Sequence, residues 1–413
     1  MNDNGMQKAT ILGKEKNAIE TRVDLMDKRV QRGKDRGVYA FMQVSDKVDG
    51  IHLEVDGRPM IQFSSYSYLD LNGHPRIQEA AKKSLEEFGT GTHGVRFLAG
   101  TLRVHIELEQ TIARFKQTEE AMTLPSGYAA NLGTLAALLN RNDIVISDKL
   151  NHASIVDGCR ISGAEIKRFD HNDMEALERA LAESPEEATK LIVTDAVFSM
   201  DGDIINLPEM VRLKKKYDAM LMVDEAHSLG VLGETGHGIE EYFGMVDPEA
   251  IDVKMGTMSK AIPSVGGYIA GSRKLINYLK HTVRPFIFSA ALPPASAAAA
   301  KAAFEVIESE PERVKKLRLN TEYFISGLKK RGFNTLNTKT PIVPIVVGHE
   351  YNTYTMTRIA AEEGIFAVPV IAPAVPAGTD RIRATVTAGH SIPDIDRALG
   401  VFEKAGKQVG VLF

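Results

Sequence analysis

Short apolar segments alternate with helical segments between residues 121 and 227, and this alternation restricts the fold more than any other feature of the chain. Most of the apolar segments are hydrophobic at nearly every position, which is typical of strands buried on both faces of a sheet. Repeated strand–helix units of this kind favour an α/β fold, with a mainly parallel sheet covered by helices on both sides. The predicted strands are 121–124, 143–147, 164–169, 190–197 and 219–227.

The length of 413 residues predicts more than one domain. A mixed-charge segment at 11–36 carries apolar residues at three- and four-residue steps, so we expect a helix whose apolar face docks on the main body or on a partner subunit. A free, solvated helix is the alternative. We expect an N-terminal helical arm and β passage at 1–60, a large α/β domain at 61–290 and a smaller C-terminal α+β domain at 291–413.

The composition narrows the class of protein. The formal net charge of −4 lacks the basic character that nucleic-acid binding usually requires, so no nucleic-acid partner is expected. The single cysteine, Cys159, excludes an internal disulfide and a cysteine-clustered metal site, and we expect it to be a small buried residue. The polar N-terminus lacks the apolar core of a signal peptide, and no stretch reaches the roughly 20 apolar residues of a membrane span. We therefore expect a cytoplasmic protein with no transmembrane segment and no metal.

Lys260 stands at a turn between two apolar, strand-like runs in the segment 251–271. A lysine in such a place is costly unless it is paired, exposed or covalently engaged. Thr257 and Ser259 beside it offer hydroxyl groups that suit a phosphate. The chemical interpretation is a lysine that forms a Schiff base with a carbonyl cofactor. A surface lysine on a loop is the ordinary alternative for a lysine considered alone.

Other polar residues follow the predicted strands, where ligands collect in parallel sheets. Asp224 and His227 end one strand, Ser199 follows the preceding strand, and His152 follows an earlier one. Asp224 could keep the nitrogen of a heterocyclic cofactor protonated, while His227 and Ser199 could reach a ring oxygen. Asp224 could equally cap a helix or pair with an arginine, and His152 considered alone is typical of a capping histidine.

The chain carries an ordered set of motifs between residues 126 and 383. They are SGYAANLG (126–133), SDKLNHASIVDG (147–158), FSMDGD (198–203), VDEAHSLGVLG (223–233), GTMSKA (256–261), GGYIAG (266–271), RPFIFSAALPP (284–294) and RIR (381–383). Each glycine-rich motif is weak evidence by itself, but the ordered set resembles the α-oxoamine synthases, a group within the fold-type I pyridoxal-phosphate enzymes. The resemblance covers nearly the whole chain from about Gly37 and implies the fold-type I transferase fold.

The resemblance also assigns roles to individual residues. Lys260 would form the Schiff base with pyridoxal 5'-phosphate and then act as general base and acid, and Arg383 would bind the amino-acid carboxylate. Ser289 would contribute from the neighbouring subunit, which implies a homodimer with shared active sites. The remaining cofactor contacts would be Asp224 at the ring nitrogen, His227 and Ser199 at the ring oxygen, His152 on the ring face, and Gly127, Tyr128, Thr257 and Ser259 at the phosphate.

The reaction implied by the family is the decarboxylative condensation of an amino acid with an acyl thioester, carried by CoA or by a carrier protein. Three segments, FGTGTHGVRFLAGT, DGCRISGAEIKRFDHND and PFIFSAALPP, are most similar to bacterial serine palmitoyltransferases, which points to L-serine and a long-chain acyl-CoA in sphingolipid biosynthesis. Tyr66 in SSYSYLDL replaces the asparagine that much of the family has, and we expect it to be a second contact for the substrate carboxylate. Asp70 replaces a glycine, and Pro263 replaces a small or flexible residue.

Four other functions make different demands on the sequence. A glycine- or alanine-using member of the family, such as 2-amino-3-ketobutyrate CoA ligase or 8-amino-7-oxononanoate synthase, is the principal alternative. A nicotinamide dehydrogenase would need the glycine fingerprint GxGxxG, which the chain lacks. An aminotransferase would share Asp224 and Lys260 but would release a keto acid. A non-catalytic subunit would be expected to lose Lys260, which is present.

Overall fold

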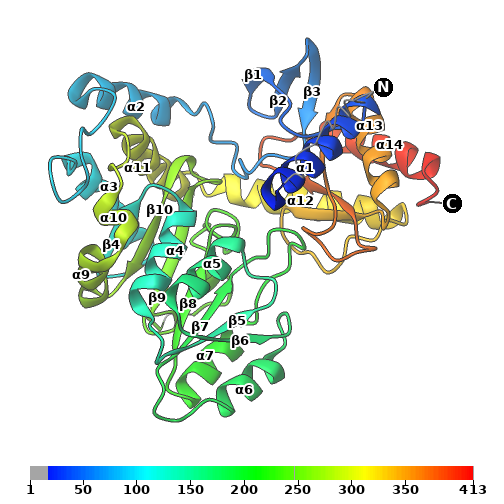
Figure 1. Cartoon of the computed structure of the whole chain (residues 1–413). Coiled ribbons are helices and arrows are strands. Elements are labelled where there is room, and N and C mark those ends of the chain that lie inside the picture. Colours follow the sequence, from blue (N-terminus) through cyan, green and yellow to red (C-terminus); the bar gives the residue numbers. More distant parts are fainter. Residues whose placement is uncertain (1–16, 246, 413) are drawn as a thin grey trace, which may run out of the picture. The chain divides into compact units, whose positions relative to one another are not determined.

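The computed structural model describes residues 17–245 and 247–412 (Figure 1), and contacts divide the chain into two compact units, residues 1–43 and 44–413. The first unit holds helix α1 (Ala18–Asp35). Asn17 caps this helix, because its side chain accepts a hydrogen bond from the Glu20 amide at 3.0 Å and its own amide donates to the Glu20 carboxylate at 2.9 Å. The expected helix is confirmed from residue 18 onward, and residues 11–16 lie outside the described part.

The second unit contains a seven-stranded sheet with the strand order β4-β10-β9-β8-β7-β5-β6. Strand β10 runs antiparallel to β4 and β9, and the other neighbouring pairs are parallel. The predicted mainly parallel sheet is therefore confirmed (Figure 1). The strands are β4 (Glu120–Leu124), β5 (Ile144–Asp148), β6 (Glu165–Phe169), β7 (Lys190–Asp195), β8 (Met220–Asp224), β9 (Val253–Ser259) and β10 (Pro263–Gly271).

Successive residues of these strands face two different hydrophobic cores. In β7, Ile192 belongs to one core, whereas Leu191 and Val193 belong to the other. Both faces are thus buried, which explains why the strands are apolar at nearly every position. Cys159 is buried in the second core, as expected. The first core is covered by α2 (Pro75–Phe88), α3 (Arg103–Phe115), α6 (Met174–Ala182), α7 (Leu207–Lys216), α8 (Ile239–Tyr242) and α11 (Pro294–Ser309), and the second by α4 (Gly127–Leu138), α5 (Ala153–Ser162), α9 (Arg273–Thr282) and α10 (Arg284–Phe288).

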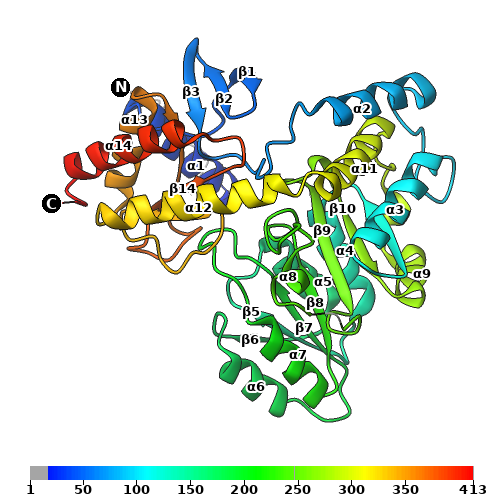
Figure 2. The ribbon, with the colours of Figure 1, turned by 180° about the vertical axis from the view of Figure 1, so that it is seen from behind.

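Two smaller sheets and a third core complete the unit (Figure 2). Phe63, Phe324 and Phe402 meet in this core, with ring centroids 5.5 to 6.4 Å apart. One sheet has the order β1-β2-β3-β12 and the other the order β11-β14-β13. The expected domain boundaries at residues 60 and 290 stay predictions. The elements are β1 (Ser45–Asp49), β2 (His52–Val55), β3 (Arg58–Gln62), α12 (Glu312–Lys330), β11 (Ile342–Val346), α13 (Glu350–Glu362), β12 (Ile365–Phe366), β13 (Val368–Val370), β14 (Arg381–Thr385) and α14 (Ile392–Gln408).

One edge of the large sheet gathers the carboxyl ends of its parallel strands. Strand β7 ends at Asp195, β8 at Asp224 and β9 at Ser259, directly before Lys260. Strand β4 runs in the same direction as β9 because both are antiparallel to β10, so the helix that follows it, α4, begins at this edge too. Ligands of open α/β sheets bind at such an edge. Among the helices of the described residues, none has the length and apolar character of a membrane span.

Candidate active site

Lys260 lies in a line of three side chains at this edge of the sheet. Its amine nitrogen Nζ is 2.9 Å from Nε2 of His227, and the other ring nitrogen, Nδ1, is 2.7 Å from the Tyr68 hydroxyl. Burial lowers the pKa of Lys260 to about 8, although the carboxylates of Asp224 and Asp195 oppose this change. Burial likewise holds the pKa of His227 well below its ordinary value, so its ring is neutral. A buried amine with a lowered pKa is what a Schiff-base lysine requires.

Asp224 is buried at the end of β8 and has two polar partners. One oxygen accepts a hydrogen bond from the Asn131 side chain at 2.7 Å, and the other accepts from the Ala226 amide at 2.8 Å. Asp195, at the end of β7, lies close enough to interact with it. Burial, and then the Asp224 carboxylate, raise the pKa of Asp195 well above the ordinary value. Asp195 therefore holds its proton more tightly than an ordinary aspartate does.

His152 caps α5 and also faces this group of charges. Its ring nitrogen Nδ1 lies 2.7 Å from the Ser154 hydroxyl, and its backbone amide donates to Asp195 at 2.7 Å. Desolvation lowers the pKa of His152, the Asp224 carboxylate opposes that shift, and Lys260 adds to it. His152 therefore caps α5, and in this position its imidazole also lies beside the charges that surround Lys260.

Arg383 brings a buried guanidinium to the cluster from β14. Its Nε donates to the Ser199 carbonyl at 2.6 Å and its Nη1 donates to the Thr385 hydroxyl at 3.0 Å. The remaining nitrogen, Nη2, is buried and has no hydrogen-bond partner among the residues that the structure describes. The guanidinium also lies over the Tyr66 ring, 5.1 Å from its centroid. A buried donor without an acceptor is costly, so this geometry suits an incoming carboxylate.

The residues predicted to hold a phosphate group meet at the start of α4. The Thr257 and Ser259 hydroxyls lie 2.9 Å apart. A side chain at Gly127 would bring its Cβ within 3.0 Å of the Thr257 hydroxyl, so the residue type keeps this space open. Tyr128 donates a hydrogen bond to Asp157, and its ring centroid lies 6.3 Å from that of His152. Backbone amides at a helix start, with two hydroxyls beside them, are a common phosphate-binding arrangement.

Ser289 is the predicted site residue that the structure does not bring into the cluster. It follows α10, and within the described part of the chain no hydrogen bond joins it to Lys260, His227 or Arg383. Its neighbour Ala290 forms a β-bridge with Val95 instead. This placement agrees with the expectation that Ser289 serves another subunit, which stays a prediction.

Sequence reasoning missed Tyr68, Asn131 and Asp195, all of which contact the predicted site residues. Asn131 carried a signal, because it is the one amide side chain within the mostly apolar helix segment GYAANLGTLAAL. Asp195 also carried a signal, since it is an acid at the end of β7, just as Asp224 is at the end of β8, the next strand along the chain. Tyr68 carried none, because a tyrosine beside a leucine is usually a packing residue.

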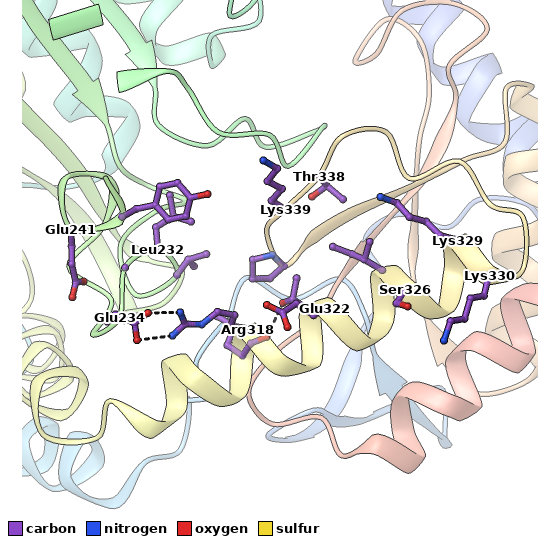
Figure 3. Close-up of a pocket in the computed structure, with 17 residues that line it drawn as sticks. Leu232, Glu234, Glu241, Arg318, Glu322, Ser326, Lys329, Lys330, Thr338 and Lys339 are labelled. Atoms are coloured by element: carbon purple, nitrogen blue, oxygen red, sulfur yellow. Dashed lines mark hydrogen bonds and ion pairs between the residues drawn. The ribbon is translucent and has the colours of Figure 1, made fainter. Parts of the chain in front are cut away.

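A separate cavity of about 730 Å³ is lined by none of the predicted site residues. Figure 3 draws the side chains around it. Helix α12 forms one side, with Arg318, Ser326 and Lys329, and the turn after β8 contributes Leu232 and Glu234. Arg318 and Glu234 form an ion pair at 2.7 Å across one end. The predicted chemistry therefore has its residues at the sheet edge and not in this cavity.

Comparison with known proteins identifies the class to which this site belongs. Residues 58–402 match the model of the aminotransferase class I and II family. The chain superposes on the serine palmitoyltransferase of Sphingomonas wittichii with a TM-score of 0.92 at 34% identity, over 96% of this chain and 100% of that one. A second serine palmitoyltransferase structure, which carries pyridoxal phosphate, also gives 0.92, at 35% identity and with the same coverage. The fold and the buried lysine–carboxylate site thus define a pyridoxal-phosphate-dependent transferase of fold type I.

The curated relatives identify the family within this class. The chain is 44% identical over 391 residues to the 8-amino-7-oxononanoate synthase of Thermoanaerobacter pseudethanolicus, covering 94% of this chain and 98% of that protein. It is 42% identical over 382 residues to the serine palmitoyltransferase of Sphingobacterium spiritivorum, covering 92% and 95%. The chain belongs to the α-oxoamine synthase family, and the expected cofactor, pyridoxal phosphate, is confirmed by the same relationship.

Proposed function

We propose that this enzyme joins the α-carbon of a small L-amino acid to the acyl group of a thioester, with loss of CO2 and release of the free thiol. The observation that carries the proposal is the unpartnered Nη2 of Arg383 in the same cluster as the Lys260 amine. The guanidinium supplies a receptor for a carboxylate, and the amine supplies a base beside it. Together they fit an α-amino acid whose Cα proton must be removed.

The residues fit pyridoxal phosphate. Thr257, Ser259 and the start of α4 would hold its phosphate, and Asp224 would hold the proton on its ring nitrogen. His227 and Ser199 would contact the ring oxygen, and His152 would stack on the ring. When bound, the cofactor supplies an electron sink that stabilises negative charge on the amino-acid α-carbon.

The chain's own residues would bind the amino-acid carboxylate and transfer the proton. Arg383, with Tyr66 against its guanidinium, would orient the amino-acid carboxylate. Lys260 would take the proton from the α-carbon and return one after condensation, which requires a neutral amine. Its pKa of about 8 makes a substantial neutral fraction available just above neutral pH, whereas an ordinary lysine would be almost wholly charged there.

Two members of the family are candidates for the substrate pair. The curated relatives favour the alternative over the first interpretation, because 8-amino-7-oxononanoate synthases are prominent among them. The product in that name contains nine carbons. Alanine contributes two of them after decarboxylation, so the acyl group must be a seven-carbon dicarboxylic acid. The second candidate is L-serine with a long-chain acyl thioester, supported by the TM-score of 0.92 with serine palmitoyltransferases.

An assay of thiol release separates these candidates. Glycine, alanine and serine are crossed with pimeloyl and palmitoyl thioesters, each presented on CoA and on a carrier protein. We expect alanine with a pimeloyl thioester to give the highest kcat/KM, with serine lower by about 10- to 100-fold, as is usual for discrimination of one small group. Highest activity with serine and palmitoyl-CoA would favour the second candidate. Transfer of the amino group without thiol release would contradict the proposed reaction.

A homodimer with shared active sites is the proposed assembly. Phe97, Leu98 and Phe288 form an exposed apolar group, which we call the Phe97 patch, and Leu98 is 81% and Phe288 72% exposed. The Ala291 amide donates to the Gly94 carbonyl at 3.0 Å, so the segments that carry the patch lie together. Ser289 directly follows Phe288. Exposed apolar groups of this kind are typical of interfaces, and burying the patch would carry Ser289 towards a second copy.

The Phe97 patch can be tested by adding charge. The double variant Leu98→Glu, Phe288→Glu is expected to be monomeric and to lose most of its thiol-release activity, because buried carboxylates would be unpaired. Leu319→Glu, an exposed leucine on α12, is the matched control and should stay dimeric. Ser289→Ala should remain dimeric but hold the cofactor about tenfold less tightly, as expected for one lost hydrogen bond to a charged group. Sedimentation and cofactor-release measurements detect these effects, and a fully active monomer would contradict the shared site.

The cytoplasmic location stays a prediction.

A further inference from the structure

Tyr68 contacts His227, the neighbour of Lys260, and has no part in the function proposed above. Its side chain is fully buried, and its hydroxyl is 2.7 Å from Nδ1 of His227. Burial raises the pKa of Tyr68 to about 12, so the hydroxyl keeps its proton throughout the physiological range. A buried hydroxyl that cannot donate its proton carries a substantial free-energy cost. The hydrogen bond to His227 is therefore the feature that determines where this proton goes.

The direction of that hydrogen bond follows from counting donors and acceptors. Nδ1 of His227 is the acceptor that lies within hydrogen-bonding distance of the Tyr68 hydroxyl among the described residues. Two other polar groups lie near the hydroxyl: the guanidinium of Arg383, which can only donate, and Tyr66, whose side chain forms no hydrogen bond with the Tyr68 hydroxyl among the described residues. Tyr68 therefore donates to Nδ1. A neutral imidazole that accepts at Nδ1 carries its one proton on Nε2.

We infer that Tyr68 is a positioning residue that holds His227 in the tautomer with its proton on Nε2, and that His227 thereby donates to the Lys260 amine. Nε2 is 2.9 Å from Nζ of Lys260. With a proton on Nε2, the amine must accept the hydrogen bond, which only its uncharged form can do. Tyr68 thus acts through His227 to keep Lys260 in the form that attacks a carbonyl group or removes a proton.

The charges around Lys260 set the background for this effect. Asp224 and Asp195 favour its charged form, and Arg383 and burial oppose it. His227 faces Lys260, Arg383 and His152, all of which disfavour a second proton on its ring. The tautomer of His227 is the one contribution that can change without any change of net charge. The inference rests on the role proposed above for Lys260, but the tautomer itself can be measured without that role.

The tautomer is tested by nitrogen NMR of the full-length protein with labelled histidine. We expect the wild-type His227 signals to show the proton on Nε2, before and after removal of the cofactor. In Tyr68→Phe the proton becomes free to move to Nδ1, and Nε2 can then accept a hydrogen bond from the charged amine. The neutral fraction of Lys260 at pH 7 should fall roughly tenfold, the effect of one charge-assisted hydrogen bond.

That fraction is measured on the cofactor-free chain from the pH dependence of Lys260 acetylation, located by mass spectrometry. The midpoint should move to higher pH in Tyr68→Phe. Tyr268→Phe is the matched control, since Tyr268 is also fully buried but its hydroxyl has no hydrogen-bond partner within the described part of the chain. It should leave both the His227 tautomer and the acetylation profile unchanged.

Two results would overturn the inference. If nitrogen NMR of the wild-type protein finds the His227 proton on Nδ1, the inference is wrong, and this result does not require Tyr68→Phe to fold. A folded Tyr68→Phe protein with an unchanged acetylation midpoint overturns it as well. Neither result depends on substrate, so a failure of the proposed reaction is distinguishable from a failure of this inference.

Discussion

Replacing Lys260 with alanine is expected to remove the visible absorption band that borohydride reduces, and to lower thiol release by at least about a thousandfold. The amine is the buried nucleophile of the site, with a pKa of about 8, and it faces the Asp224 and Asp195 carboxyl groups. The variant loses both covalent attachment of the cofactor and proton transfer, and proton transfer alone typically contributes about 10²- to 10⁴-fold. Absorption spectra before and after reduction, together with thiol release, measure the two losses separately.

The control for this variant is Lys274→Ala, which removes an exposed lysine from α9. It should keep both the absorption band and the activity. Retention of the reducible band in Lys260→Ala would show that another amine holds the cofactor. In that case the proposed catalytic role of Lys260 would be wrong, although the family membership would stand.

Replacing Asp224 with asparagine should lower kcat by about a thousandfold and leave the protein folded. Asparagine has the shape of aspartate and can still accept from the Ala226 amide, but its NH2 group cannot accept from Asn131, and it cannot carry the negative charge that keeps a ring nitrogen protonated. A contact between opposite charges at about 4 Å is worth about 4 kcal/mol at an effective dielectric constant of about 20. That energy corresponds to about a thousandfold in rate.

Asp195→Asn provides a closely matched control, because it makes the same change in the neighbouring buried carboxyl group. Burial and Asp224 raise the pKa of Asp195, so asparagine resembles the protonated form that this shift favours. Its backbone contact with His152 needs only an acceptor oxygen, which asparagine also has. We expect less than about a tenfold loss of kcat. Equal damage from the two substitutions would contradict the assignment of the negative charge to Asp224.

The local pattern of the sequence was enough to predict the large sheet. The segments around Val193 and Met222 are apolar at successive positions, and the structure buries both faces of those strands. The end of β8 at Asp224 and the turn at Lys260 were also visible, since a charged residue after an apolar run is a local signal. Such features depend on neighbours in the chain, so the sequence carries them directly.

The partners of those residues could not be predicted in the same way. Tyr68 meets His227 across 159 positions of the chain, and Arg383 meets Ser199 across 184. Asn131 reaches Asp224 only because α4 packs over the sheet beside β8. No local periodicity specifies these contacts, because they depend on how separate elements pack.

The sequence by itself therefore determined the main elements, the lysine and the acid predicted to act at the sheet edge, and the family to which the chain belongs. Only the tertiary structure decided which buried carboxyl group has a raised pKa, which nitrogen of Arg383 lacks a hydrogen-bond partner among the described residues and which side chain contacts Nδ1 of His227. The physical reason is that hydrogen-bond direction and protonation are set by burial and by the geometry of all neighbouring groups together, and those neighbours come from distant parts of the chain.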